Sequence, residues 1–62
     1  MNEPVQIILV FKDKTHDENI VSYSLKRYAY IVGTNSIRIE SKDDDNDMRI
    51  VPFNSLEQII IN

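Results

Sequence analysis

Runs of apolar residues bounded by polar clusters predict short β-strands along most of the chain. Residues 5–12 are rich in β-branched and aliphatic side chains and lead into a polar cluster at residues 13–19, as in a strand followed by a loop. The centre of this run, residues 7–11, is apolar at consecutive positions instead of alternate ones. A strand of this kind is typically covered on both of its faces.

Residues 17–32 fit two patterns. Apolar and polar residues alternate over residues 21–26, as in a half-buried strand, and the segment is rich in Val, Ile and Tyr, which favour strands. The alternation slips by one residue near Lys26 and Arg27, as a β-bulge would cause. We therefore expect a pair of strands that is kinked at this point.

The alternative is a helix at about residues 17–32, packed on a three- or four-stranded sheet in an α+β fold. The spacing of Thr15 and Glu18 matches a capping box, acidic residues precede the segment, and Gly33 follows it where a helix often ends. Four apolar residues also recur at helical spacing, namely Val21, Leu25, Tyr28 and Val32. Both interpretations of this segment remain open at the level of the sequence.

A β-hairpin is predicted after Gly33. Residues 37–41 and 48–53 have the composition of strands, and the acidic loop of residues 42–47 separates them. A symmetric loop would place opposite charges face to face on one side of the hairpin and isoleucines on the other. The predicted pairs are Ile39 with Ile50, Glu40 with Arg49 and Ser41 with Met48. The predicted buried residues are Ile37, Ile39 and Ile50, and the predicted exposed residues are Arg38, Glu40 and Arg49.

The C-terminal segment resembles part of a known group of folds. Residues 49–60 read Arg-Ile-Val-Pro-Phe-Asn-Ser-Leu-Glu-Gln-Ile-Ile, and they resemble the closing segment of SH3-like and Sm-like small barrels. In those folds a strand, a short 3₁₀ turn and a last strand follow in that order, often with a proline where the turn begins. The resemblance brings no functional motif with it. Together with the other strands it implies an all-β fold, a small five-stranded antiparallel barrel or meander.

Composition narrows the class of protein. The 62 residues are 42% hydrophobic and 27% charged, which is typical of one small globular domain over residues 1–62. The chain has no cysteine, which favours a reducing compartment and hence the cytoplasm. The first residues lack the basic region of a signal peptide, and the apolar run at residues 7–11 is too short to span a membrane. Frequent Ile, Asn, Lys and Asp, which have AT-rich codons, hint at a bacterial or phage source.

The residue types exclude several kinds of chemistry. Gly33 is the only glycine, whereas phosphate-binding loops need two or three. Without cysteine, and with His16 as the only histidine, a zinc site lacks ligands. The acidic run at residues 43–47 has aspartates at alternate positions, as in a calcium-binding EF-hand loop, but Met48 and Asn54 replace the required Gly and Glu. We therefore expect no metal and no cofactor.

We also expect no enzyme. His16 and Asp17 lie near Ser22 and Ser24 in the sequence, but a nucleophilic triad also requires an oxyanion hole and an enclosed substrate pocket. A chain of 62 residues seldom builds both. The prediction is a loop histidine and no catalytic residue.

The candidate binding surface is the segment in which aromatic and basic residues interleave. It consists of Tyr23, Lys26, Arg27, Tyr28 and Tyr30. These tyrosines can simply pack on the sheet, they can form a protein-binding hot spot with the arginine, or they can stack bases beside the two cations. The net charge of −3 disfavours binding to a phosphate backbone.

These observations predict a non-catalytic interaction protein that binds a protein partner, for example a phage or bacterial accessory or inhibitor factor. Two other functions stay open: a nucleic-acid-binding small barrel that uses Lys26 and Arg27, and a ligand-sequestering homo-oligomer with its site between subunits. We expect a homo-oligomer, most simply a dimer, because residues 7–11 and 59–61 are apolar at consecutive positions. Each of these strands presents apolar side chains to both faces of its sheet, and a second copy would cover one of them.

Overall fold

Strands make up most of the computed structural model, which describes residues 3–13 and 19–62. These residues contain six strands and one 3₁₀ helix: β1 (Gln6–Phe11), β2 (Ile20–Ser24), β3 (Tyr28–Val32), β4 (Ser36–Ser41), β5 (Met48–Pro52), η1 (Phe53–Ser55) and β6 (Leu56–Ile61). Residues 20–32 are two strands and a turn, so the helix over residues 17–32 is wrong. The β-branched and aromatic composition of this segment outweighs its helical spacing. The capping box of Thr15 and Glu18 lies outside the described residues.

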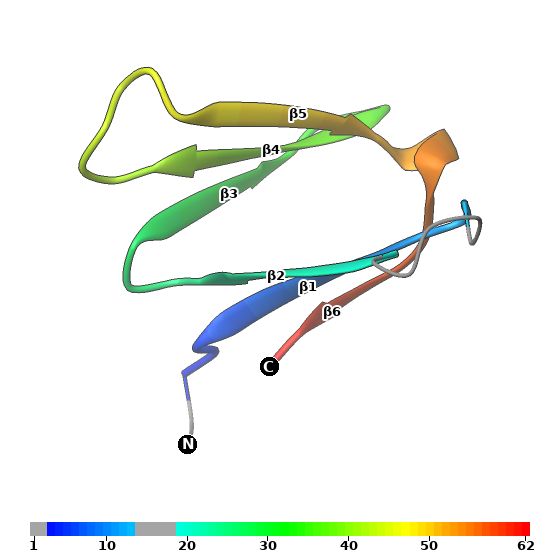
Figure 1. The fold of residues 1–62 in the computed structure, drawn as a ribbon, viewed down its shortest axis with the longest axis horizontal. Helices are drawn as coiled ribbons and strands as arrows, with labels where there is room; N and C mark the ends of the chain where they lie inside the picture. Colours follow the sequence, from blue (N-terminus) through cyan, green and yellow to red (C-terminus); the bar gives the residue numbers. More distant parts are fainter. Residues whose placement is uncertain (1–2, 14–18) are drawn as a thin grey trace.

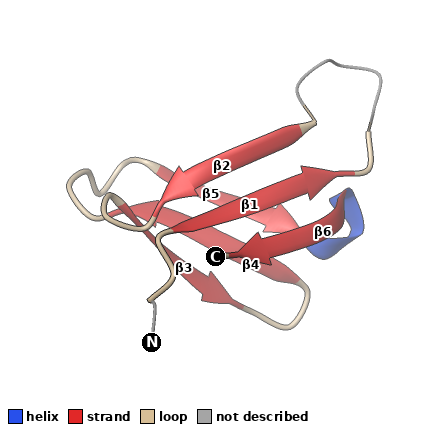
Figure 2. Ribbon diagram, turned by 90° about the horizontal axis from the view of Figure 1, so that it is seen from below, coloured by secondary structure: helices blue, strands red, loops and turns tan. Residues whose placement is uncertain are grey.

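The strands form two antiparallel sheets of three strands each. Sheet A has the order β2-β1-β6 and sheet B the order β3-β4-β5. Figure 1 shows the sheets as two layers, and Figure 2 shows the strands of one layer running across those of the other, as in orthogonal sheet packing. The prediction of an all-β antiparallel fold is confirmed. The two sheets remain separate and do not form the closed five-stranded barrel that was one expected arrangement.

The chain passes from sheet A to sheet B at Lys26. The Leu25 N–H donates to the Val5 carbonyl beside sheet A at 2.9 Å, whereas the Arg27 carbonyl accepts from the Lys42 N–H beside sheet B at 2.8 Å. The predicted β-bulge at this place is therefore a turn that joins two different sheets. This turn explains why the alternation of apolar residues slips by one, and the two expected strands belong to different sheets.

The helix η1 makes the second passage between the sheets. The Phe53 N–H donates to the Asn35 carbonyl beside sheet B at 2.9 Å, and the Ser55 carbonyl accepts from the Lys12 N–H beside sheet A at 3.0 Å. Pro52, with φ −66° and ψ 142°, is the residue that precedes this helix, a position at which the missing N–H of proline costs nothing. The order of strand, 3₁₀ turn and strand is the order that the resemblance to SH3-like and Sm-like barrels implied.

The β4–β5 hairpin has a register that differs by one residue from the predicted one. The observed pairs include Arg38 with Ile50, Ile39 with Arg49 and Glu40 with Met48. The loop is one residue shorter than predicted, because the Ser41 N–H donates to the Asp47 carbonyl at 2.9 Å. Ser41 therefore faces Asp47 and not Met48.

This shift exchanges the two sides of β5, because a one-residue slip moves every side chain to the other face. Ile50 is 57% exposed and Val51 only 2% exposed, so the prediction that Ile50 is buried is wrong. The predicted burial of Ile37 and Ile39 is confirmed. Among the residues predicted to be exposed, Arg38 and Arg49 are exposed and Glu40 is half-buried.

The hydrophobic core lies between the two sheets. Its buried members are Ile7, Leu9, Ile37, Ile39, Val51 and Leu56, contributed by both layers. Each aliphatic side chain removed from water stabilises the fold by about 1.5–3 kcal/mol. The alternate residues of β1, Ile8 and Val10, point to the opposite face of sheet A, where they are half-buried. The consecutive apolar residues of β1 thus serve two faces.

Candidate functional site

The predicted binding surface is divided between the turn after β2 and the core. Lys26 and Arg27 are exposed in this turn. Tyr23 and Tyr28, on either side of the turn, have ring centroids 5.1 Å apart in an edge-to-face arrangement. Tyr30, like these two, is partly buried and packs against the core. The structure therefore brings Tyr23 and Tyr28 together, but it uses the tyrosine rings in packing and leaves the two cations beside them in solvent.

The hydroxyl groups of Tyr23 and Tyr28 have hydrogen-bond partners. Tyr28 donates to Asp47 Oδ2 at 3.0 Å, and Tyr23 accepts from Arg49 Nη1 at 3.3 Å. The hydrogen bond to Asp47, together with the negative charge of Asp47, raises the pKa of Tyr28 above its ordinary value of 10.0. At neutral pH, Tyr28 is therefore a hydrogen-bond donor that is already engaged within the fold.

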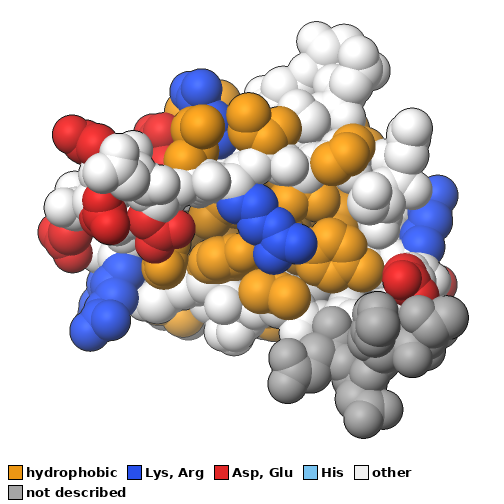
Figure 3. Space-filling model, turned by 45° about the horizontal axis from the view of Figure 1, so that its top comes forward, with side chains coloured by type: hydrophobic (Ala, Val, Ile, Leu, Met, Phe, Trp, Pro, Cys, Tyr) orange, Lys and Arg blue, Asp and Glu red, His pale blue; other side chains and the backbone are white. Residues whose placement is uncertain are grey.

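The acidic loop between β4 and β5 is held by its own hydrogen bonds. Ser41 Oγ accepts from the N–H groups of Asp43 and Asp44 at 3.2 and 3.1 Å, and Asp44 Oδ1 accepts from the Asn46 N–H at 2.9 Å. Figure 3 shows acidic side chains gathered at this end of the molecule. Within residues 3–13 and 19–62, no three His, Cys, Asp or Glu side chains are arranged to hold a metal ion. The histidine and aspartate of the weighed triad, His16 and Asp17, lie outside the described residues.

A surface that the sequence did not predict covers the outer side of sheet B. We call it the Arg38 face and define it by Ile31, Arg38, Glu40, Met48 and Ile50. Ile31, Met48 and Ile50 are 44%, 49% and 57% exposed. The solvent side of an antiparallel sheet is usually polar, so apolar side chains on both outer strands are unusual.

Arg38 stands at the centre of this face. In the register of sheet B it lies opposite Ile31 on one side and Ile50 on the other. Its Nε is 3.8 Å from Glu40 Oε2 on the same strand, and both side chains remain partly exposed. An ion pair of this length and exposure is weak. The guanidinium therefore keeps most of its capacity to bind another group.

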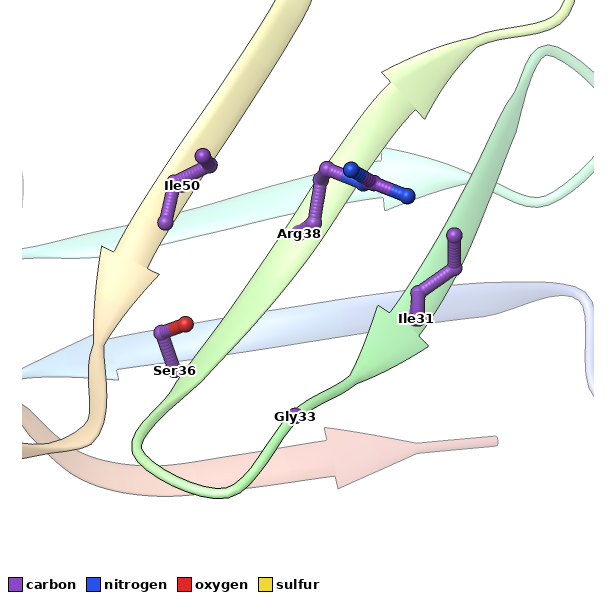
Figure 4. A pocket seen from close by; sticks show the side chains of 5 residues that line it. All are labelled: Ile31, Gly33, Ser36, Arg38 and Ile50. Carbon is purple, nitrogen blue, oxygen red and sulfur yellow. The ribbon is translucent and has the colours of Figure 1, made fainter.

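An open cavity of about 260 Å³ lies on the Arg38 face and is lined by Ile31, Gly33, Ser36, Arg38 and Ile50. Figure 4 shows Ile31, Arg38 and Ile50 on neighbouring strands and Gly33 in the turn after β3, with the Arg38 side chain extending towards Ile31. A Cβ atom at Gly33 would approach the Ser36 carbonyl oxygen to 3.2 Å. Glycine thus permits the close turn and leaves this end of the cavity free of a side chain.

The sequence contained a signal for this face, but the predicted register concealed it. Residues 37–39 alternate Ile, Arg, Ile, which correctly places Arg38 on the solvent side. Ile50 was predicted to be buried, so its position beside Arg38 was missed. The contribution of Ile31 depends on the pairing of β3 with β4, which sequence alternation alone does not specify.

The sequence also does not indicate the role of Arg49, whose side chain reaches from sheet B to sheet A. Its guanidinium carbon lies 5.2 Å from the centre of the Phe11 ring of β1, within cation–π distance. The same side chain donates to the Tyr23 hydroxyl of β2. Arg49 therefore connects sheet B to two strands of sheet A.

The fold and these surfaces define the class, a small all-β protein of two crossed antiparallel sheets. No known family matches the chain, and comparison with curated proteins and with solved structures also finds no match. In the part of the chain that the structure describes, no helix is long and apolar enough to cross a membrane.

Proposed function

We propose that this chain is a non-catalytic interaction protein that works in the cytoplasm and binds a protein partner through the Arg38 face. One observation carries the proposal: Ile31, Arg38 and Ile50 form a continuous row across all strands of sheet B, with the two isoleucines exposed on either side of the cation. The lack of cysteine supports the reducing compartment. The protein acts by occupying a surface of its partner, as a bacterial or phage accessory or inhibitor factor would.

The chemistry of the face indicates what the partner presents. Protein interfaces are enriched in Met and Arg, and their binding energy is concentrated in a few residues whose surrounding contacts exclude water. A carboxylate accepts two parallel hydrogen bonds from a guanidinium, and the ion pair of Arg38 with Glu40 is long and partly exposed. The matching partner segment therefore has a carboxylate flanked by aliphatic or aromatic side chains.

The arrangement of the predicted binding surface around Lys26 and Arg27 supports nucleic-acid binding less well. Stacking of bases requires aromatic faces that are free beside the cations. Tyr23, Tyr28 and Tyr30 pack against the core instead. Lys26 and Arg27 then provide charge without a stacking platform, in a chain whose net charge is −3.

The test is co-purification of the tagged protein from its natural source, followed by affinity measurements with the purified partner. Ile50→Glu should weaken binding by more than about tenfold, because it removes an apolar contact and places a carboxylate beside Arg38. The matched control is Val5→Glu. Val5 is 61% exposed, close to the 57% of Ile50, but lies beside sheet A and belongs to neither the Arg38 face nor any strand of sheet B. The partner should be measured in solution and should have one binding site, so that avidity does not mask the difference between the variants.

Two results would contradict the proposal. If Ile50→Glu binds the partner as tightly as the wild type does, the partner docks elsewhere. If the protein instead binds single-stranded DNA or RNA in a salt-dependent manner, and Lys26→Glu with Arg27→Glu abolishes that binding, the nucleic-acid function is correct.

A further inference from the structure

The outer side of sheet A forms a second surface, and it has an unusual composition. Its residues follow from the pairing of β1 with β2 and β6: Gln6, Ile8, Val10, Ile20, Ser22, Ser24, Gln58 and Ile60. None of these eight side chains is charged, although 27% of the chain is. We call this surface the neutral face. Figure 2 looks onto it, and no described element lies in front of its strands.

The apolar residues of the neutral face form a contiguous diagonal strip from β2 across β1 to β6. Ile8 is opposite Ile60, and Val10, two residues along β1, is opposite Ile20. Ser24 lies opposite Gln6 at one end, where Gln6 also donates to Asn62 Oδ1 at 3.0 Å. Ser22 and Gln58 lie on either side of this strip, so apolar and uncharged polar side chains adjoin one another, as they do in protein interfaces.

We propose that a second copy of this chain packs against the neutral face, so that two sheets A stack across a twofold axis. In a twofold interface the same patch meets itself. Any charged residue near the axis would then face a like charge, and two chains of net charge −3 already repel each other. A patch without charges avoids this repulsion.

The polar residues of the neutral face also suit contact with themselves. Glutamine and serine side chains each contain a hydrogen-bond donor and an acceptor. The same residue on two copies can therefore pair with itself, whereas a lysine or a carboxylate cannot. This self-complementarity distinguishes a second copy from an unrelated partner, whose surface would be free to supply complementary charges.

The size of the face also agrees with a small dimer. A standard interface buries about 800 Å² on each partner, and the side of the molecule that carries the neutral face in Figure 2 spans 31 × 25 Å. An interface of this size would use most of that side, and stacked sheets are a common arrangement, with about 10 Å between layers. This inference does not depend on the proposed function, because that function uses the opposite sheet.

Sedimentation equilibrium over a range of protein concentrations tests the proposal. The wild type should show the mass of two chains of 7.3 kDa at high concentration. Ile20→Glu should raise the dissociation constant by more than about tenfold, because two unpaired carboxylates would meet in the interface. Ile50→Glu, a matched change on sheet B, should leave the dimer intact. If Ile20→Glu does not fold, Ser22→Glu on the same face replaces it.

Added salt gives an independent readout. Screening reduces the repulsion between the two acidic chains, so the dimer should be as stable or more stable at high salt, whereas a dimer held by ion pairs would weaken. Three results would overturn the proposal: a single-chain mass at every concentration, a dimer that survives both sheet A variants, or a dimer that salt dissociates.

Discussion

The hydrogen bond from Tyr28 to Asp47 links the first residue of β3 to the end of the acidic loop. At the scale of single residues, this contact also changes the pH at which Tyr28 ionises, because a tyrosinate would lie beside the Asp47 carboxylate. The pKa of Tyr28 is raised above its ordinary value of 10.0. This bond therefore stabilises the folded state below about pH 10 and its contribution is lost as the pH rises through the higher pKa of the folded protein.

Replacing Asp47 should bring the Tyr28 pKa back towards its ordinary value. Asp47→Asn removes the charge that disfavours the tyrosinate, so Tyr28 should ionise at a lower pH than in the wild type. An NMR titration that follows the Tyr28 ring signals measures this change. Asp45→Asn is the control, since it removes an equal charge from the same loop without touching this hydrogen bond. Equal shifts in the two variants would show that general loop charge, and not the Asp47 contact, governs Tyr28.

At the scale of the elements, the loop decides the register of the hairpin and therefore which residues are core. The sequence correctly predicted the strands on both sides of residues 42–47, and the alternation at residues 37–39 correctly predicted a buried Ile37 and Ile39. It did not predict the hydrogen bonds with which Ser41 closes the loop. The predicted register would pair Glu40 with Arg49 as opposite charges, whereas the observed register buries Val51.

The two neighbours Ile50 and Val51 should respond very differently to truncation. Val51→Ala should lower the free energy of unfolding by about 1.5–3 kcal/mol, because the valine is buried. Ile50→Ala should cost less than about 1 kcal/mol, because its side chain is exposed. Urea unfolding of both variants measures the difference. A larger loss for Ile50→Ala than for Val51→Ala would restore the register predicted from the sequence.

At the scale of the whole molecule, the two sheets are joined by two corners of the chain, by the core between them and by the Arg49 side chain. Composition and strand patterns predicted the all-β class, and Pro52 marked the position of the second corner. Neither could predict that the chain changes sheets at Lys26, because alternation is the same in a bent strand and in two strands. The change of sheet at Lys26 determines which faces are exposed. The sequence therefore indicated the predicted binding surface with its three tyrosines and missed the Arg38 face.

Arg49 should stabilise the folded state by holding the two sheets together. Arg49→Ala removes the contact with Phe11 and the hydrogen bond to Tyr23, and should lower the free energy of unfolding by about 1 kcal/mol. Arg38→Ala, which removes the long, partly exposed pair with Glu40, should cost less than about 0.5 kcal/mol. Thermal and urea unfolding compare the two. Equal losses would mean that Arg49 does not hold the sheets together.

The pairing of β1 with β6 has a consequence for how the protein emerges during translation. Sheet B is a meander of consecutive strands, so it can form while the ribosome is still adding residues, since its contacts are local in sequence. Sheet A forms later than sheet B, because its central strand β1 precedes all other strands of the two sheets and its partner β6 follows all of them. Until β6 emerges, one edge of the apolar strand β1 stays without a partner. For this interval the nascent chain resembles an unprotected sheet edge, which is the form that chaperones bind and that aggregates most readily.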